Sequence, residues 1–159
     1  TDPDDEAEAM YLAVLDATQE GHVALDCGAA SSIGGLEALA ALSNLATKQI
    51  GGDVQVDTTV RIPFRFGNGS KQSTVSKVTA PTRIGERTGT VAYNVLDAQA
   101  PALLGMDFLT KSGAVVDFAT KTARFKHLGP EVHELKRLDS GHLAVRMVGR
   151  EVPATLPRV

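Results

Sequence analysis

The spacing of apolar residues along the chain changes period several times, and each change marks the boundary of an element. Leucines recur every third position from Leu36 to Leu45, with alanines between them. This period predicts one amphipathic helix over residues 36–50, ended by the two glycines that follow it. A shorter helix is predicted over residues 106–112, with Gly113 as its C-terminal cap.

Most of the remaining chain consists of short apolar or alternating runs bounded by turn residues, which is typical of β-strands. Glycine-containing turns at residues 67–69 and 139–141 predict two hairpins, and a third is expected between residues 9–15 and 22–26. Residues 31–35 and 97–101 are expected to be loops. The predicted strands are residues 9–15, 22–26, 54–56, 58–66, 71–78, 81–84, 89–95, 102–105, 114–118, 122–125, 132–138 and 142–148. The pattern therefore predicts a mostly β fold with one or two short helices.

Composition narrows the class of protein. The chain has 159 residues, enough for one domain with a real core, and a formal net charge of −3 that disfavours nucleic-acid or membrane-surface binding. No apolar run reaches the length of a membrane span, and no signal-peptide pattern is present. Cys27 is the single cysteine and the four histidines are scattered, so we expect no internal disulfide, no metal site and no cofactor.

One acidic residue stands out against this pattern. The apolar run that begins at Val23 ends at Asp26, and the chain then turns through Cys27, Gly28 and Ala29. Aspartate is disfavoured in strands and is seldom fully buried without a partner. A turn-initiating aspartate at a strand end is the simpler interpretation. The alternative is a carboxylate delivered to a functional cleft, and a second stretch about eighty residues on favours it.

That second stretch reads Ala-Leu-Leu-Gly-Met-Asp-Phe-Leu at residues 102–109, and the first reads Ala-Leu-Asp-Cys-Gly-Ala at residues 24–29. Together, in this order, they resemble the retropepsins, the aspartic proteases of retroviruses and long-terminal-repeat retrotransposons. The resemblance covers residues 10–125. It implies a closed-barrel-like acid protease fold in which two chains each contribute one catalytic aspartate, here Asp26. One carboxylate would act as a base on water while the other, protonated, polarises the scissile carbonyl.

The resemblance also assigns roles to other residues. Asp107 is expected to be structural rather than catalytic. The flap that covers the substrate would be the glycine-rich hairpin tip between the two motifs. The implied site residues are Cys27, Gly28 and Ala29 in the active-site loop; Ala30, Ser31, Phe66, Gly67, Asn68, Gly69 and Ser70 for substrate binding and the flap; and Leu103, Leu104 and Gly105 in the supporting strand.

Two departures from the family pattern affect this interpretation. Cys27 stands where the family has a hydroxyl that bonds across the dimer, and a thiol is a weaker donor. Ala30 and Ser31 stand where retroviral members often have acidic residues that bind the substrate backbone, so that contact does not carry over. A retropepsin-like dimerisation or binding module without strong catalytic activity is therefore the alternative function.

The expected organisation of the chain follows from its composition and from the resemblance to the retropepsins. Residues 1–9 would be an acidic tail, residues 10–125 the protease core, and residues 126–159 a C-terminal hairpin extension and tail that contribute to the dimer interface. The expected partners are a second copy of the chain and a peptide or polyprotein substrate, with no nucleic acid and no membrane. The expected function is a homodimeric aspartic endopeptidase that processes a retrotransposon polyprotein in the cytoplasm or an intracellular particle.

Overall fold

The computed structural model describes residue 18 and residues 20–65 and 71–149, and the following statements concern that part of the chain. The predicted tail at residues 1–9, the predicted strand at residues 9–15 and residues 152–159 lie outside it. The described chain is mostly β with two helices, α2 (Leu36–Gln49) and α3 (Met106–Ser112), which confirms the predicted class. No helix within the described residues has the length and apolarity needed to cross a bilayer.

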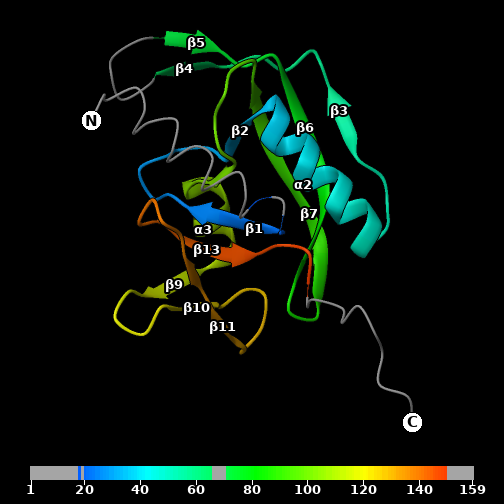
Figure 1. Ribbon diagram of the computed structural model, residues 1–159. Helices are drawn as coiled ribbons and strands as arrows, with labels where there is room; N and C mark the ends of the chain where they lie inside the picture. Colours follow the sequence, from blue (N-terminus) through cyan, green and yellow to red (C-terminus); the bar gives the residue numbers. More distant parts are fainter. Residues whose placement is uncertain (1–17, 19, 66–70, 150–159) are drawn as a thin grey trace.

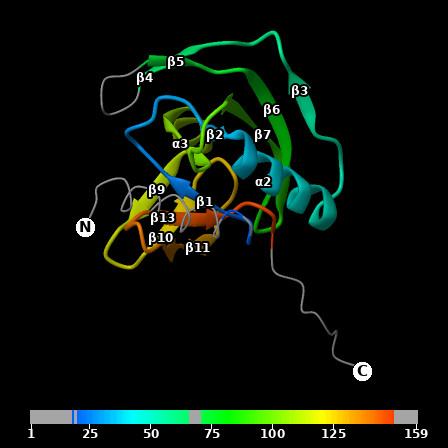
Figure 2. The ribbon, with the colours of Figure 1, turned by 45° about the horizontal axis from the view of Figure 1, so that its top comes forward.

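The strands form one large sheet, one small sheet and a hairpin (Figure 1). The large sheet has the order β12 (Lys136–Arg137), β13 (Leu143–Arg146), β1 (His22–Leu25), β8 (Leu103–Leu104), β2 (Ile33–Gly35), β7 (Arg87–Leu96), β6 (Ser76–Ile84) and β3 (Gln55–Asp57). The small sheet has the order β11 (Val132–Glu134), β10 (Thr122–Phe125) and β9 (Ala114–Asp117), and the hairpin joins β4 (Pro63–Arg65) to β5 (Lys71–Ser73). In both overall views this hairpin and the small sheet lie at opposite ends of the molecule (Figure 2).

The large sheet is not the closed barrel that the resemblance implied. Within the described residues, β12 and β3 each have one strand neighbour, so the sheet is open at both edges. It does curl back on itself at one point. The Arg83 N–H donates to the Met147 carbonyl at 2.8 Å, and the Gly149 N–H donates to the Arg83 carbonyl at 2.7 Å. This single parallel bridge joins β6 to the chain beyond β13 without pairing the strands along their length.

The centre of the large sheet brings together two stretches that are distant in sequence. β8 runs parallel to β1, with Ala24 opposite Leu103, and antiparallel to β2, with Ile33 opposite Leu103. Ala24 and Leu104 are both fully buried. Burial on both faces explains why these strands are uninterrupted apolar runs rather than alternating ones. The fold therefore places residues 102–105 directly beside the strand that leads to Asp26.

The predicted long helix is confirmed almost to the residue. α2 buries the face that carries Ala38, Leu39, Leu42 and Ala46, and it covers β6 and β7 (Figure 1). It ends where Gly51 adopts a φ of 88°, a left-handed conformation that favours glycine. The shorter helix α3 ends at Gly113 in the same left-handed region, with a φ of 66°, as predicted.

The prediction of a loop at residues 31–35 is wrong, because Ile33–Gly35 forms the buried strand β2. Its two glycines gave the segment a turn-like composition, but they serve close packing. A Cβ added to Gly34 would lie 2.9 Å from the Leu39 side chain, and one added to Gly35 would lie 2.4 Å from the Ala98 carbonyl oxygen. Neither position has room for a side chain.

The C-terminal segment also differs from its prediction. Residues 132–138 form two short strands instead of one, and β11 pairs with β10 while β12 pairs with β13. β13 then pairs with β1, Val145 opposite Val23, so β1 lies between β13 and β8. Ala144, Val145 and Met147 are buried in this chain's own core. As far as residue 149, the segment expected to contribute to a dimer interface adds β11 to the small sheet and β12 and β13 to the large sheet of its own chain.

Candidate active site

Asp26 occupies the first position after β1, and its backbone is held by the neighbouring strand. Its N–H donates to the Leu104 carbonyl at 2.9 Å, and its own carbonyl accepts from the Ala29 N–H at 3.2 Å. The Oδ1 atom of its carboxylate accepts from the Gly28 N–H at 2.9 Å, which closes an Asx turn. Asp26 is half-buried, so its carboxylate is held by the Gly28 N–H while the side chain stays partly accessible to solvent.

This carboxylate lines a cleft of about 630 Å³. Two walls come from the loops that follow β1 and β7, and a third comes from Pro63 and Phe64 in β4. Among the described residues that line it, Asp26 is the one ionisable side chain. The full lining is Asp26, Gly28, Ala29, Ala30, Ile33, Pro63, Phe64, Leu96, Ala100, Pro101 and Leu103. A single carboxylate in a mostly apolar cleft of this size suits a peptide-sized ligand with apolar side chains.

The loop after Asp26 is supported from below by the start of α3. The Met106 N–H donates to the Ala29 carbonyl at 2.7 Å, and the Asp107 N–H donates to the Ala30 carbonyl at 3.1 Å. A Cβ added to Gly105 would lie 2.6 Å from the backbone of Ser31. The first free N–H groups of the helix are therefore used by the loop, and glycine allows the two backbones to touch.

The predicted site residues take different positions in the structure. Asp26, Gly28, Ala29, Ala30 and Leu103 line the cleft. Leu104 and Gly105 lie behind the loop as its support, and Cys27 is an exposed free thiol at its tip. The flap residues at positions 66–70 lie outside the described residues.

The hairpin on either side of the predicted flap is present and is anchored at its base. β4 and β5 pair antiparallel from Pro63 opposite Ser73 onwards. The buried residue Thr74 then makes two reciprocal bonds with Ile62: its N–H donates to the Ile62 carbonyl, and its Oγ1 accepts from the Ile62 N–H, both at 2.9 Å. The Gln72 amide donates to the Asp97 carbonyl at 3.3 Å. The Ile62–Thr74 bonds therefore close the base of the hairpin, and the Gln72 bond joins the hairpin to the loop after β7, part of which lines the cleft.

One pair of residues beneath the site was not predicted from the sequence. The Asp107 carboxylate accepts hydrogen bonds from both the N–H and the hydroxyl of Ser32, a residue that is fully buried. Asp107 was predicted to be structural, and its partner lies 75 positions away. The available signal was weak: Ser32 lies in a segment with the composition of a loop, and although a buried serine needs a hydrogen-bond partner, nothing in the local sequence identifies that partner.

The same carboxylate influences a buried tyrosine. Tyr93 is 1% exposed, and its hydroxyl has no hydrogen-bond partner among the described residues. Burial raises the pKa of the Tyr93 hydroxyl well above its ordinary value of 10.0, and the nearby negative charge of Asp107 raises it further. Tyr93 therefore stays neutral at any pH at which a folded protein would normally be studied.

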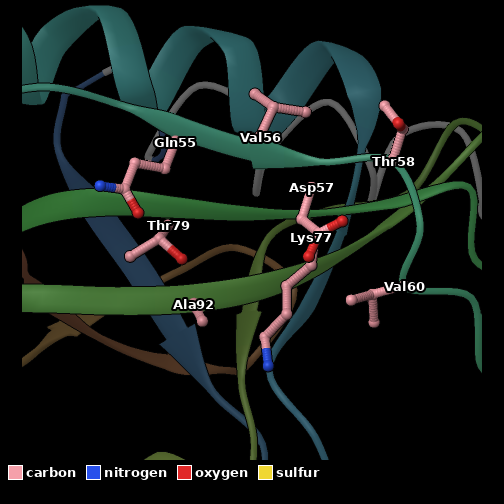
Figure 3. A pocket seen from close by; sticks show the side chains of 8 residues that line it. All are labelled: Gln55, Val56, Asp57, Thr58, Val60, Lys77, Thr79 and Ala92. Carbon is pink, nitrogen blue, oxygen red and sulfur yellow. The ribbon is translucent and has the colours of Figure 1, made fainter.

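A second cavity of the same volume, about 630 Å³, lies beneath the edge strand β3 and is lined by residues of β3, β6 and β7 and the loop after β3 (Figure 3). It contains Asp57, whose Oδ1 accepts from the Thr59 N–H at 2.9 Å and from the Thr59 hydroxyl at 2.5 Å. These bonds lower the pKa of the Asp57 carboxyl below its ordinary value of 3.8, and the charge of Lys77 lowers it further. Within the described chain, no three His, Cys, Asp or Glu side chains gather closely enough to hold a metal ion.

Comparison of the chain with protein-family models and with curated proteins gave no match in either case. The function is therefore argued from the residues and the geometry of the cleft.

Proposed function

We propose that this chain is a retropepsin-like aspartic endopeptidase that acts as a homodimer, with water activated between the Asp26 carboxylates of two copies. The observation that carries the proposal is the placement of Asp26. It follows a strand whose central residues, Val23 and Ala24, are fully buried, its loop is held by β8 and α3, and its carboxylate opens into a peptide-sized cleft. The simpler interpretation of a turn-initiating aspartate accounts for the Asx turn but not for the bonds that hold its loop to β8 and α3.

The chemistry requires a second carboxylate. Aspartic proteolysis uses one ionised and one protonated carboxyl group that share a proton across a short distance. The described lining of the cleft supplies one, and Cys27 and Gly28 at the loop tip are exposed. A two-fold axis close to this tip would bring the two Asp26 side chains together and would cover the exposed loop at the same time.

The proposed substrate is an extended polypeptide, such as a retroelement polyprotein or the target of a cellular enzyme derived from one. Residues of β4, in the β4–β5 hairpin, and of the loop after β7 line the cleft together with the loop after Asp26, and an exposed hairpin edge beside a cleft suits a peptide bound as a strand. Ala30 lines the wall where retroviral relatives often carry an acidic residue. Backbone carbonyl and N–H groups are therefore the natural substrate contacts on that side.

The test compares Asp26→Asn with Asp53→Asn, an exposed aspartate that does not line the cleft. Each purified variant is incubated at concentrations above the dimerisation midpoint with a precursor polypeptide and with a library of apolar-rich peptides. The wild type and Asp53→Asn should cleave, and Asp26→Asn should lose all detectable cleavage because the dyad loses its ionisable group. Cleavage by Asp26→Asn at the wild-type rate would disprove the proposal.

The thiol at position 27 favours a second candidate, a retropepsin-like dimer that binds peptides without cleaving them. Cys27 is exposed and free where a hydroxyl would tie two loops together, and a thiol is a weaker donor. For this candidate, sedimentation shows a dimer while no peptide is cleaved, and Cys27→Thr does not restore cleavage. Cleavage that depends on Asp26 excludes it.

A further inference from the structure

We propose that Asp107 is a positioning residue for the active site, acting through Ser32 to hold the loop that carries Asp26. This inference deepens the proposed function and rests on it for its catalytic consequence. The structural part stands on hydrogen bonds alone and is tested separately below. Asp107 does not line the Asp26 cleft, so any effect it has on the reaction is transmitted through the loop.

Several hydrogen bonds join the Asp107 carboxylate to both the backbone and the side chain of Ser32. The Ser32 N–H lies 3.0 Å from both carboxylate oxygens of Asp107, and the Ser32 hydroxyl donates to Oδ1 at 2.8 Å. The same hydroxyl oxygen accepts from the Gly105 N–H at 3.1 Å. Ser32 therefore links the loop that leaves the active site to the junction between β8 and α3. Hydrogen bonds to an ionised acceptor are stronger than neutral ones, which favours a carboxylate here.

The backbone completes the connection in both directions. The N–H groups of Met106 and Asp107 donate to the carbonyls of Ala29 and Ala30, and the Ser32 carbonyl accepts from the Asn94 N–H on β7 at 3.0 Å. The loop of residues 29–32 is thus bonded to α3 at one end and to the large sheet at the other. Asp26 reaches this loop through the Ala29 N–H, which donates to the Asp26 carbonyl. Release of Ser32 would free the segment that sets the direction of the Asp26 side chain.

The experiment pairs Asp107→Ala with Asp117→Ala. Asp117 also accepts hydrogen bonds from two backbone N–H groups, those of Ala119 and Thr120 at 2.9 and 3.1 Å, but it lies in the turn between β9 and β10. The two variants therefore lose comparable side-chain-to-backbone bonds at different places. Asp107→Asn, which keeps one acceptor oxygen, serves as the conservative variant for rescue.

The first readout needs no catalysis. Cys27 is exposed in the single chain, is its one cysteine and directly follows Asp26. Its rate of alkylation by a maleimide therefore reports loop geometry when it is measured on dilute, monomeric protein, in which no partner covers the loop tip. Asp107→Ala should change this rate several-fold while Asp117→Ala leaves it at the wild-type value. Circular dichroism and thermal melting confirm that each variant is folded at the assay temperature. An unchanged alkylation rate in folded Asp107→Ala would overturn the inference whether or not the protein is a protease.

The second readout is the division of the effect between kcat and KM. Misplacement of a reacting group by about 1 Å lowers turnover by about 10²-fold. Asp107→Ala should therefore lose kcat with little change in KM, and Asp107→Asn should recover most of it. A KM effect as large as the kcat effect, or equal losses in Asp107→Ala and Asp117→Ala, would show a merely structural role and overturn the inference. If the wild type cleaves no substrate, the proposed function fails while the alkylation result still decides the positioning role.

Discussion

Two cavities of about 630 Å³ lie on this molecule, and each contains an aspartate in the same local conformation. In both, the carboxylate Oδ1 accepts a hydrogen bond at 2.9 Å from the N–H two residues later, Gly28 for Asp26 and Thr59 for Asp57. Cavity size and turn chemistry therefore do not distinguish them. The difference lies in what surrounds each turn.

Asp26 follows a strand with neighbours on both sides, and the loop after it is bonded to a helix and to a second strand. Asp57 ends an edge strand whose three residues are all exposed. Its carboxylate is already occupied by the N–H and the hydroxyl of Thr59. The same Asx turn thus holds the proposed catalytic carboxylate in one place and an ordinary strand end in the other. Long-range support, rather than local sequence, separates the two.

The largest effect is expected from adding a single methyl group at Gly105, because it would displace the backbone that supports the loop after Asp26. In Gly105→Ala the new Cβ would lie 2.6 Å from the Ser31 carbonyl group and 2.8 Å from the Ala29 carbonyl oxygen, so backbone must move. We expect a loss of stability of about 1–3 kcal/mol, as for other overpacked sites. Any Asp26-dependent cleavage should fall by more than this loss of stability accounts for, because the displaced backbone belongs to the loop after Asp26.

The matched control for this variant is Gly89→Ala, on β7. A Cβ there meets nothing within 4 Å. Chemical denaturation should show no loss of stability, or a gain of up to about 1 kcal/mol from reduced freedom of the unfolded chain. Equal stability and equal cleavage rates in the two variants would contradict the account of the loop's support.

A smaller effect is expected from filling each cavity in turn. Ala30 lines the Asp26 cleft and Ala92 lines the cavity beneath β3, so Ala30→Phe and Ala92→Phe place the same bulk in spaces of the same volume. Ala30→Phe should lower kcat/KM by about tenfold or more, since a misfitting group costs on the order of 1–3 kcal/mol in a binding pocket. Ala92→Phe should leave kcat/KM within about twofold. Steady-state kinetics on one peptide measures both values. A larger loss of kcat/KM in Ala92→Phe than in Ala30→Phe would indicate that the substrate binds in the cavity beneath β3 and would contradict the assignment of the Asp26 cleft.

The contrast between local and long-range structure also explains which parts of the fold could be predicted. The two helices follow from local periodicity and from the glycines after them, and β9 and β10 follow from the short apolar runs at residues 114–118 and 122–125; the structure confirms all four elements. Strand β2 was missed because Gly34 and Gly35 have the composition of a loop, although they are required by packing against Leu39 and Ala98. The pairing of β1 with β13 was missed because it depends on residues far along the chain, whereas the resemblance had already assigned Leu103 and Leu104 of β8 to a strand that supports the loop after β1.

The candidate site shows the same division. Asp26 and Leu103 could be nominated because an apolar run ending in an acid, and a later apolar-Gly run, are visible in the sequence. Pro63 and Pro101 could not, because they line the cleft only once a hairpin and a loop from distant parts of the chain are folded against it. Ser32 illustrates the limit most clearly. Its value to the site depends on a carboxylate 75 positions away.

The smallest expected effect is on the stability of the folded protein at low pH, and it comes from Asp57. Hydrogen bonds from Thr59 lower the pKa of this carboxyl below 3.8, so the folded state binds the Asp57 proton less readily than the unfolded state does. The contribution to stability is therefore present above pH 3.8 and is lost as the pH falls through the lowered value. Asp57→Asn should melt slightly below the wild type at about pH 5, and the gap should narrow towards about pH 2.5. Thr59→Ala, which keeps the charge but loses the hydroxyl bond, should lie between them. If the melting temperatures of the wild type and Asp57→Asn differ by the same amount at every pH in this range, the ionised Asp57 carboxylate contributes nothing to folding stability. Of the two Asx turns compared, only the one at Asp26 would then have a structural consequence.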